Sequence, residues 1–354
     1  MIEKFFNIRY IFGKEQVWKA IDRVVDKGQK GYVVVADGVV VNTAQRLADY
    51  RKAIAAGLFA ICDSGWVPLY LKKIYGMQRE QYCGPMIFKD FVERRKHRMF
   101  FMGTNQQTLD GLRKELTKLN PDVSGMTFYE LPFRSVEDFD YESIAQMLEE
   151  DGADIIWVAL GAPKQDFFMQ RLLPYLKRGV MIGVGAAFKF YSGTEEKRAP
   201  EWVRKAHLEF VYRILQDPKK QLARCYWIVR MLPHMFKEEK GKKRDADEVT
   251  AALYNYVESV KSKQKEPLVK ATRKVLETIS VYDEGHCRDK MNEYWLQVVD
   301  AALDALLATK AACIQDSHVH EEIDRFARQM VHLLDRESPE CDMVLRKAEI
   351  LGMG

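Results

Sequence analysis

The chain has 354 residues, with 55 lysines and arginines, 51 aspartates and glutamates, and a formal net charge of +4. This charge is too small to argue for a nucleic-acid-binding protein. The apolar fraction of 47% is enough for a substantial core, and the length suits one large domain with a smaller second one.

Several absences in the sequence bear on the compartment. The six cysteines form no C-x-x-C pair, which argues against a zinc site or a disulfide framework and favours a reducing cytoplasm. The first residues lack a signal-peptide pattern, and no apolar run reaches the length of about 18 residues that suggests a transmembrane helix. We therefore expect a cytoplasmic protein.

Helices and strands alternate through the first part of the chain. Apolar residues at helical spacing predict helices over 14–28, 43–56 and 68–75. Short apolar runs predict strands over 32–36 and 59–62. Residues 39–42 either continue the first strand or form its turn, and the second strand ends at Asp63-Ser64-Gly65.

The same alternation continues to Gly185. Strands are expected over 98–103, 126–129, 154–160 and 179–185. Helices are expected over 107–119 with Thr104 as N-cap, over 136–151, and after the turn at 161–166. This order predicts an α/β fold, a doubly wound, Rossmann-like and mostly parallel sheet over residues 1–200.

The composition changes in the last part of the chain. Residues 203–244 hold twelve lysines or arginines and four acidic residues, a net charge of +8 in which bulky apolar side chains are interleaved. Such a segment, 201–244, either lies on an anionic membrane surface or packs on the α/β domain as a solvated helix. Residues 245–354 predict an all-α extension, an interaction module that binds a protein partner or forms a homo-oligomer.

Four glycines stand where the strands are expected to end: Gly103, Gly161, Gly183 and Gly185. Ligands of open parallel sheets bind beyond the carboxyl ends of the strands. Glycine there lets the backbone approach a phosphate or a sugar, and helix N-termini favour anions. The alternative for each glycine is tight packing of a strand against a helix.

The order of four motifs is more specific than any single glycine. The motifs are Gly-Ala-Pro-Lys-Gln-Asp at 161–166, Gly-Val-Gly-Ala-Ala-Phe at 183–188, Arg-Ala-Pro at 198–200 and Leu-Glu-Phe-Val-Tyr-Arg at 208–213. In this order the chain resembles the WecG/TagA/CpsF glycosyltransferases over residues 1–236. The resemblance implies transfer of N-acetylmannosamine or a related sugar to a polyprenyl-diphosphate-linked sugar, in the synthesis of cell-surface polysaccharides.

Asp63 is the candidate catalytic residue. It follows a strand and precedes small residues, a place where a carboxylate can take the proton of an attacking hydroxyl as general base. The alternative is a turn or N-cap aspartate. In the family that the chain resembles, an Asp-Gly motif carries the proposed base; Ser64 stands in place of that glycine here.

The other candidate residues would bind substrate. Gln165 matches a glutamine of the family motif and can hydrogen-bond a sugar or a diphosphate, while Lys164 supplies charge or is a solvated lysine. Asn42 resembles the family's asparagine at the end of the second strand, or is a turn residue. Guanidinium groups pair with diphosphate oxygens, which suggests a third group of candidates: Arg198, Arg213 and Arg224.

The resemblance implies an inverting transferase that uses a UDP-sugar, needs no cofactor and acts on the inner face of the cell membrane. No Asp-x-Asp motif suitable for a donor metal is present, which favours a metal-independent reaction. Some family positions differ: Gln81, Met86 and Lys189 stand where charged groups or an aspartate are expected. A diverged member that binds without turnover is therefore the alternative. An oxidoreductase is disfavoured, because no G-x-G-x-x-G follows the first strand.

Overall fold

The computed structural model describes residues 2–193 and 226–244, together with residues 274 and 307. The chain divides into two compact units, residues 6–234 and residues 1–5 with 235–354. In the second unit, Met235 and Glu239 are buried, and Lys242 lies 3.4 Å from Glu238. The expected helical domain 245–354 lies outside the described residues, apart from two isolated positions.

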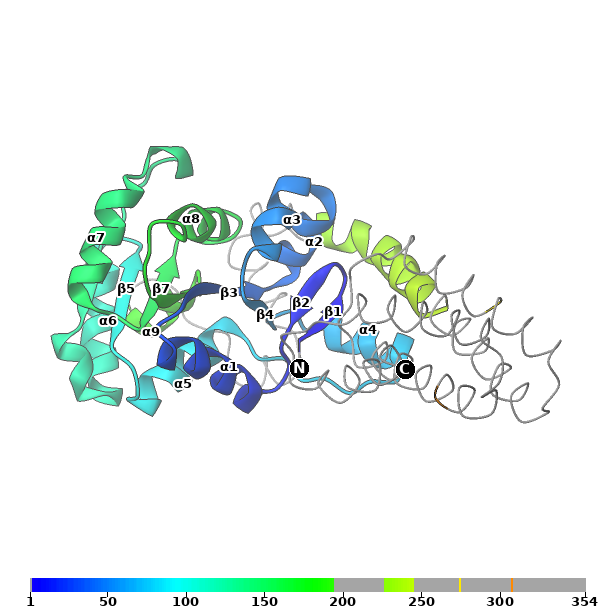
Figure 1. The fold of residues 1–354 in the computed structure, drawn as a ribbon, viewed down its shortest axis with the longest axis horizontal. Helices are drawn as coiled ribbons and strands as arrows, with labels where there is room; N and C mark the ends of the chain where they lie inside the picture. Colours follow the sequence, from blue (N-terminus) through cyan, green and yellow to red (C-terminus); the bar gives the residue numbers. More distant parts are fainter. Residues whose placement is uncertain (1, 194–225, 245–273, 275–306, 308–354) are drawn as a thin grey trace. The chain divides into compact units, whose positions relative to one another are not determined.

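The core of the fold is a single sheet with the strand order β1-β2-β4-β3-β8-β7-β5-β6 (Figure 1). Every pairing from β2 to β6 in this order is parallel. The strands are β1 (Glu3–Phe5), β2 (Ile8–Tyr10), β3 (Lys30–Ala36), β4 (Phe59–Cys62), β5 (Met99–Gly103), β6 (Thr127–Tyr129), β7 (Ile155–Ala159) and β8 (Gly179–Gly183). The predicted α/β fold with a mostly parallel sheet is confirmed.

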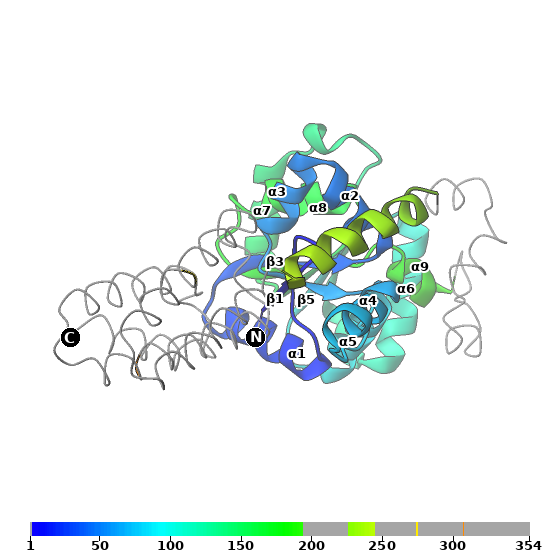
Figure 2. The same cartoon turned by 90° about the vertical axis from the view of Figure 1, so that its right-hand side faces the viewer.

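Helices cover both faces of the sheet (Figures 1 and 2). One group comprises α1 (Lys14–Asp26), α5 (Gly84–Arg94), α6 (Gln106–Leu119) and α9 (Ala187–Ser192). The other comprises α3 (Ala48–Ala55), α7 (Tyr141–Asp151) and α8 (Lys164–Leu172). Two further helices follow β3 and β4, namely α2 (Gly38–Arg46) and α4 (Trp66–Tyr75). Helices on both faces explain why the central strands are continuous apolar runs.

Aromatic side chains fill the layer between the sheet and α5. The ring of Phe88 lies 4.9 Å from that of Trp157 and 5.4 Å from that of Phe188, and all three side chains are buried. Edge-to-face contacts of this kind add to the apolar area that the rings remove from water. The helix α5 was not predicted from the sequence, although Phe88, Phe91 and Val92 recur at helical spacing.

The prediction for residues 39–42 is wrong. They belong to α2 rather than to a strand or turn, because the Asp37 carboxylate accepts hydrogen bonds from the backbone N–H groups of Val39 and Val40 at 2.9 and 2.8 Å. This N-cap starts a helix directly after β3. The single helix predicted over 43–56 is also divided, since Leu47 has an extended backbone between α2 and α3.

Two predicted helix starts are displaced. The N-cap of α6 is Asn105, whose side chain accepts from Thr108 N–H, and not Thr104, whose φ of 54° is left-handed. The helix predicted from Val136 begins at Tyr141 as α7, with Asp140 as its N-cap, after the short 3-10 helix η2 (Val136–Asp138). Asn120 ends α6 before a second 3-10 helix, η1 (Pro121–Gly125), as the sequence indicates.

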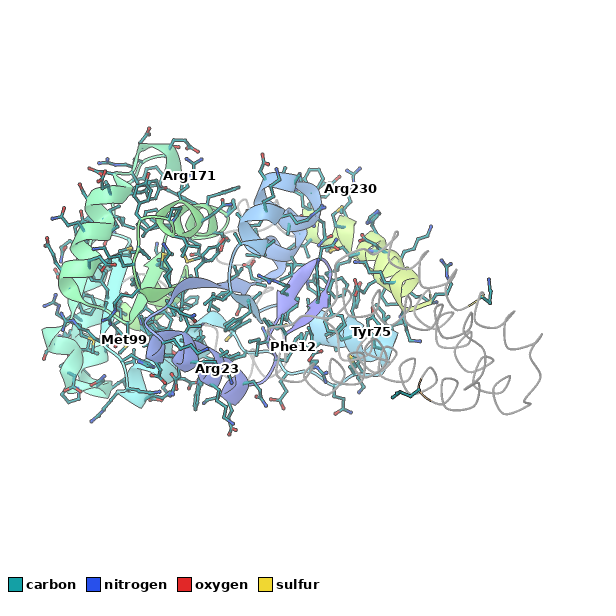
Figure 3. All side chains as sticks on the ribbon, viewed as in Figure 1. Phe12, Arg23, Tyr75, Met99, Arg171 and Arg230 are labelled. Atoms are coloured by element: carbon teal, nitrogen blue, oxygen red, sulfur yellow. The ribbon has the colours of Figure 1, made fainter. Side chains whose placement is uncertain are left out.

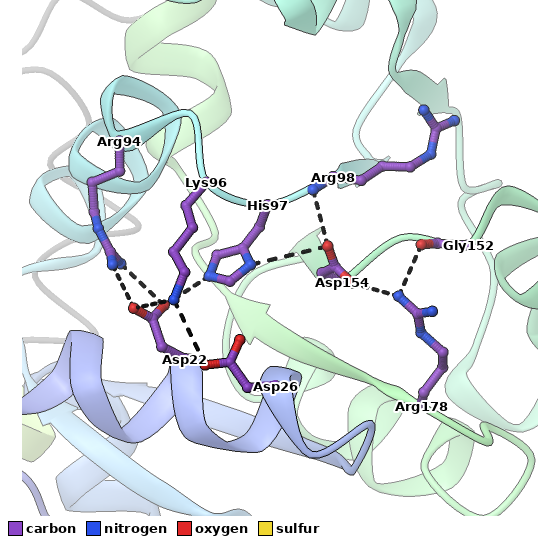
Figure 4. A network of polar contacts seen from close by, with 9 residues as sticks. All are labelled: Asp22, Asp26, Arg94, Lys96, His97, Arg98, Gly152, Asp154 and Arg178. Carbon is purple, nitrogen blue, oxygen red and sulfur yellow. Dashed lines mark hydrogen bonds and ion pairs between the residues drawn. The ribbon is translucent and has the colours of Figure 1, made fainter.

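A polar network ties α1 to the amino-terminal edge of β5 and β7 (Figure 4). Asp22 on α1 lies 2.6 Å from Arg94, 2.9 Å from Lys96 and 2.7 Å from the His97 ring. Burial raises the pKa of Asp22, but the hydrogen bonds from Arg94, His97 and Lys96 outweigh it and lower this pKa to about 2. Asp154 continues the network to Arg178. These contacts lie where the strands begin, away from the edge that carries the candidate site.

Candidate active site

The neighbouring strands β3 and β4 are each followed directly by an aspartate. Ala36 pairs with Cys62 in the parallel register, so Asp37 and Asp63 follow at the same edge of the sheet. The Asp63 backbone N–H donates to the Ala36 carbonyl at 3.2 Å. The sequence analysis missed Asp37, although an apolar strand followed directly by Asp-Gly was the signal that could have identified it.

Asp63 is held at the start of α5. Its carboxylate Oδ1 accepts a hydrogen bond from the backbone N–H of Gly84 at 3.0 Å, and the Gln81 side chain donates to the Asp63 carbonyl at 2.6 Å. A helix N-terminus stabilises a negative charge. Burial, and then the charge of Asp63, raise the pKa of the neighbouring Cys62 thiol, which is therefore neutral. The half-buried carboxylate is therefore oriented by the start of α5.

Gln165 joins two of the predicted glycine turns. Its Oε1 accepts from the Gly161 N–H at 3.1 Å, and its Nε2 donates to the Gly183 carbonyl at 3.0 Å. A Cβ at Gly183 would lie 2.9 Å from Gln165 Nε2, so only glycine fits beside the amide. The buried side chain of Gln165 thus connects the carboxyl ends of β7 and β8, and these bonds use one acceptor and one donor position of the amide.

The other glycines differ in how open they are. Gly161 has a φ of 76°, and among the described residues nothing lies within 4 Å of a Cβ placed there, so the space beside its Cα is open. A Cβ at Gly185 would lie 3.7 Å from the Gly161 Cα, which places the two turns side by side. Gly103 is packed instead, because a Cβ there would lie 2.6 Å from the Ala159 carbonyl oxygen. Of these glycines, Gly161 is therefore the open one among the described residues.

Lys164 lies beside the Gly161 turn, at the start of α8. Its Nζ is 5.1 Å from the ring of Phe133 and 5.6 Å from that of Phe139. Both contacts are cation–π interactions, which hold the ammonium group over these two rings. The structure thus brings Lys164, Gln165 and the glycine turns together, as the sequence suggested.

Asn42 lies within α2 and not at a strand end, which corrects the expected position. Its side-chain amide donates to the Trp227 carbonyl at 2.8 Å, and the Arg46 guanidinium lies 3.9 Å from the Trp227 ring. Residues 226–244 are helical, and a Cβ at Gly38 would lie 3.1 Å from Ile228. Residues 226–234, which belong to the α/β unit, therefore pack on α2 through Trp227 and Ile228.

The same segment keeps an exposed aromatic surface. Tyr226, Trp227 and Val229 are 56%, 39% and 63% exposed. Arg230, which Figure 3 labels, donates to the Tyr226 hydroxyl at 2.9 Å and lies over both rings. Residues 226–230 thus contact α2 on one side and expose aromatic and apolar side chains to solvent on the other.

The remaining candidates are distributed as follows. Arg198, Arg213 and Arg224 lie outside the described residues. Met86 is 42% exposed in the first turn of α5, and Lys189 lies on α9. Within the described ranges, no group of three or more His, Cys, Asp and Glu side chains is arranged to hold a metal ion. Residues 2–193 and 226–244 also contain no helix long and apolar enough to cross a membrane.

Comparison with known proteins gives a consistent result. A family model described as the glycosyl transferase WecG/TagA/CpsF family matches residues 5–245. The chain is 24% identical over 252 residues to the N-acetylglucosaminyldiphosphoundecaprenol N-acetyl-beta-D-mannosaminyltransferase of Bacillus subtilis strain 168, covering 68% of this chain and 93% of the relative.

Further relatives carry the same name. The protein of Bacillus spizizenii is 24% identical over 59% of this chain and 82% of its own length. The protein of Staphylococcus aureus strain MW2 is 23% identical over 53% of this chain and 73% of its own length. The fold and the matches define a glycosyltransferase. Because the family model spans well over half of the sequence, the chain belongs to the WecG/TagA/CpsF family.

Proposed function

We propose that this enzyme is an inverting, metal-independent glycosyltransferase that moves a sugar of the N-acetylmannosamine type from UDP to a polyprenyl-diphosphate-linked sugar. One observation carries the proposal. Four adjacent strands, β4, β3, β8 and β7, end in Asp63, Asp37, Gly183 and the Gly161 turn. A potential base and a glycine turn that opens a helix therefore share one edge of the sheet, where ligands of such folds bind.

Asp63 is the general base in this proposal. As the acceptor hydroxyl oxygen forms its bond to the anomeric carbon, the bond from that carbon to the UDP oxygen breaks and the hydroxyl proton passes to Asp63. A single displacement of this kind inverts the anomeric configuration. The Gly84 N–H fixes the carboxylate and Gln81 fixes the backbone carbonyl of the same residue, so that little reorganisation is needed during the transfer.

The leaving diphosphate belongs at the glycine turns. The positive end of the α8 dipole favours an anion beside the Gly161 turn, and Lys164 at the start of α8 adds a positive charge. We assign Arg198, Arg213 and Arg224 to the same diphosphate. These cations would take the place of a divalent ion in neutralising the leaving group.

The acceptor is proposed from the names of the relatives. By analogy with them, it is a polyprenyl diphosphate that carries N-acetylglucosamine. Its diphosphate lies at the membrane surface, so the enzyme would act there, peripherally on the inner face. The exposed aromatic residues of 226–230 and the charge of +8 in 203–244 support this location. Residues 1–200, 201–244 and 245–354 would then be the catalytic domain, the membrane-binding appendage and an interaction domain.

A second candidate is a family member that binds nucleotide sugar or a partner protein without turnover. It is favoured by Gln81 and Met86, which stand where charged groups are expected near Asp63, and by the engaged amide of Gln165. The distinguishing experiment measures UDP release over a panel of UDP-sugars, with and without a polyprenyl-diphosphate acceptor. Acceptor-dependent release supports the transferase. Tight UDP-sugar binding without release in any combination supports the second candidate.

A further inference from the structure

Asp166 is a buried carboxyl group at the site that the proposed chemistry does not use. It lies in the first turn of α8, directly after Gln165, and has 0% exposure. Its Oδ2 accepts a hydrogen bond from the Tyr50 hydroxyl on α3 at 2.5 Å. Its Oδ1 is also buried and has no hydrogen-bond partner among the described residues. Such a group needs an explanation, because an unpartnered charge in the interior is costly.

Among the described residues, the side chains that act on Asp166 are negative or neutral. Tyr50 faces it from α3, Tyr32 lies on β3, and the charge of Asp37 acts on it from the end of β3. The cations of its own helix are directed elsewhere: Lys164 lies over Phe133 and Phe139, and Arg171 pairs with Glu137. The described residues thus place no cation in contact with the carboxyl group.

This environment favours the neutral acid. Burial raises the pKa of Asp166 most strongly, the Tyr50 hydrogen bond opposes the rise, and the charge of Asp37 adds to it, which gives a value of about 7. Burial and the charge of Asp166 also raise the pKa of Tyr50, so its hydroxyl stays protonated and donates. Asp166 therefore changes its charge near neutral pH.

Asp166 is mechanically connected to the proposed diphosphate site. The adjacent Gln165 ties the Gly161 turn to the end of β8, while Asp166 docks the same helical turn on α3. A negative charge on Asp166 would also repel a diphosphate bound at the start of α8. We propose that Asp166 is a positioning residue: its hydrogen bond with Tyr50 docks the first turn of α8 on α3, and its protonated form allows the glycine turns to bind an anionic diphosphate.

This inference rests on the proposed function and couples donor binding to the protonation of Asp166. A bound diphosphate brings negative charge close to Asp166, and this charge favours protonation. By linkage, protonation favours diphosphate binding by the same factor. Donor binding is then coupled to the uptake of up to one proton from solution, and the released UDP leaves as the proton returns.

The test measures the affinity for UDP-N-acetylmannosamine by calorimetry from pH 6 to pH 8, in two buffers of different ionisation enthalpy. This diphosphate diester keeps a constant charge over that range. If only the protonated form binds, the dissociation constant rises about tenfold from pH 6 to pH 8, because the competent fraction falls to about a tenth. The buffers should report proton uptake. Asp166→Asn, a neutral isostere, should bind with little dependence on pH.

Two variants separate this role from a merely structural one. Tyr50→Phe removes the hydroxyl that stabilises the carboxylate, so it should move the midpoint of the pH dependence upward. Asp110→Asn changes an exposed acid on α6 and should leave the dependence as in the unmodified protein. Equal pH dependence in the unmodified protein and in Asp166→Asn, or no dependence in either, would overturn the proposal.

A measurement without nucleotide tests the protonation of Asp166 even if the proposed UDP-sugar does not bind. The folded protein binds a proton at Asp166 up to about pH 7, whereas the unfolded chain releases it near pH 4. The free energy of unfolding of the unmodified protein, relative to that of Asp166→Asn, should therefore fall as the pH rises from about 4 to about 7. A flat difference contradicts the proposal. A falling difference with no UDP-sugar binding at any pH shows instead that the proton is held but that the diphosphate assignment, and with it the proposed function, is wrong.

Discussion

The side-chain amide of Asn42 donates to the backbone carbonyl of Trp227, 185 residues later in the chain, at 2.8 Å. This bond attaches residues 226–234 to α2, the helix that begins directly after Asp37. The Arg46 guanidinium, 3.9 Å from the Trp227 ring, adds a second attachment. Residues 226–234 are therefore held at the edge of the sheet where the candidate site lies.

Asn42→Ala should loosen this attachment. A net hydrogen bond of this kind contributes about 1 kcal/mol, which corresponds to about fivefold faster amide hydrogen exchange in residues 226–234. Asn120→Ala is a matched control, because the buried Asn120 amide donates to the Val92 carbonyl at 3.1 Å, far along the chain from 226–234. Unchanged exchange of 226–234 in Asn42→Ala would show that packing alone holds the segment.

Asp63→Asn should slow sugar transfer about 10²–10⁴-fold while leaving donor binding intact, because the amide keeps the size of the carboxylate but cannot accept the proton. The rate of UDP release with a saturating acceptor is the measurement. Asp49→Asn, an exposed change next to Lys52 on α3, is the control. Near-normal turnover of Asp63→Asn would remove Asp63 from the role of base.

The sequence could predict the strand ends but not what their side chains contact. β7 and β8 are long apolar runs followed by glycines, so their bounds and the turns at 161 and 183 were identifiable. The strands β1 and β2 have three residues each, too few for a periodic pattern. At 39–42 the valine run suggested a strand, but the Asp37 cap and burial against the sheet determine a helix.

In the candidate site, too, some residues could be identified from the sequence, whereas their contacts could not. Asp63 was identifiable because it directly follows a strand. The role of Gln165 was not, since its partners Gly161 and Gly183 meet only when two strands pair. Asp166 appeared to be an ordinary acid in the first turn of a helix, and only its burial against Tyr50 distinguishes it. Contacts between residues far apart in sequence determine which polar groups remain available for substrate.

Removal of divalent ions should leave transfer largely unchanged. The proposed leaving-group site consists of backbone N–H groups, Lys164 and arginines, none of which needs a metal ion to bind an anion. Transfer rates before and after dialysis against EDTA provide the measurement. Loss of activity that magnesium or manganese restores would refute the metal-independent reaction.

Asp22 should make the fold sensitive to acid. Its folded pKa of about 2 lies below the ordinary value of 3.8, so its stabilising contribution is present above about pH 4 and is lost as the pH falls toward 2. Asp22→Asn should cost on the order of 1 kcal/mol at neutral pH, as expected for partly exposed ion pairs. Urea unfolding at a series of pH values should show this cost shrinking between pH 4 and pH 2. Asp26→Asn, whose carboxylate is more exposed and lies 3.8 Å from Lys96, should show little of this dependence.

Binding to membranes should depend on the charge of the basic segment. Each lysine or arginine near an anionic leaflet contributes about 1 kcal/mol, and salt weakens the attraction. The full-length protein should therefore co-sediment with vesicles rich in anionic lipid at low salt and be released at high salt. Reversing three charges of the segment, Lys219, Lys220 and Arg224, to Glu should abolish sedimentation and most transfer to a membrane-embedded acceptor.

The controls for this experiment separate charge from apolar insertion. Lys114→Glu reverses an exposed charge on α6, outside the segment, and should sediment normally. Val229→Ser removes a side chain that is 63% exposed and should weaken binding at both salt concentrations, if this face enters the interface. Sedimentation that depends on none of lipid charge, salt and the three reversals would mean that residues 203–244 serve only for packing, of the kind that joins Trp227 to Asn42. Recruitment to the lipid-linked acceptor would then have to come through residues 245–354 and a partner protein.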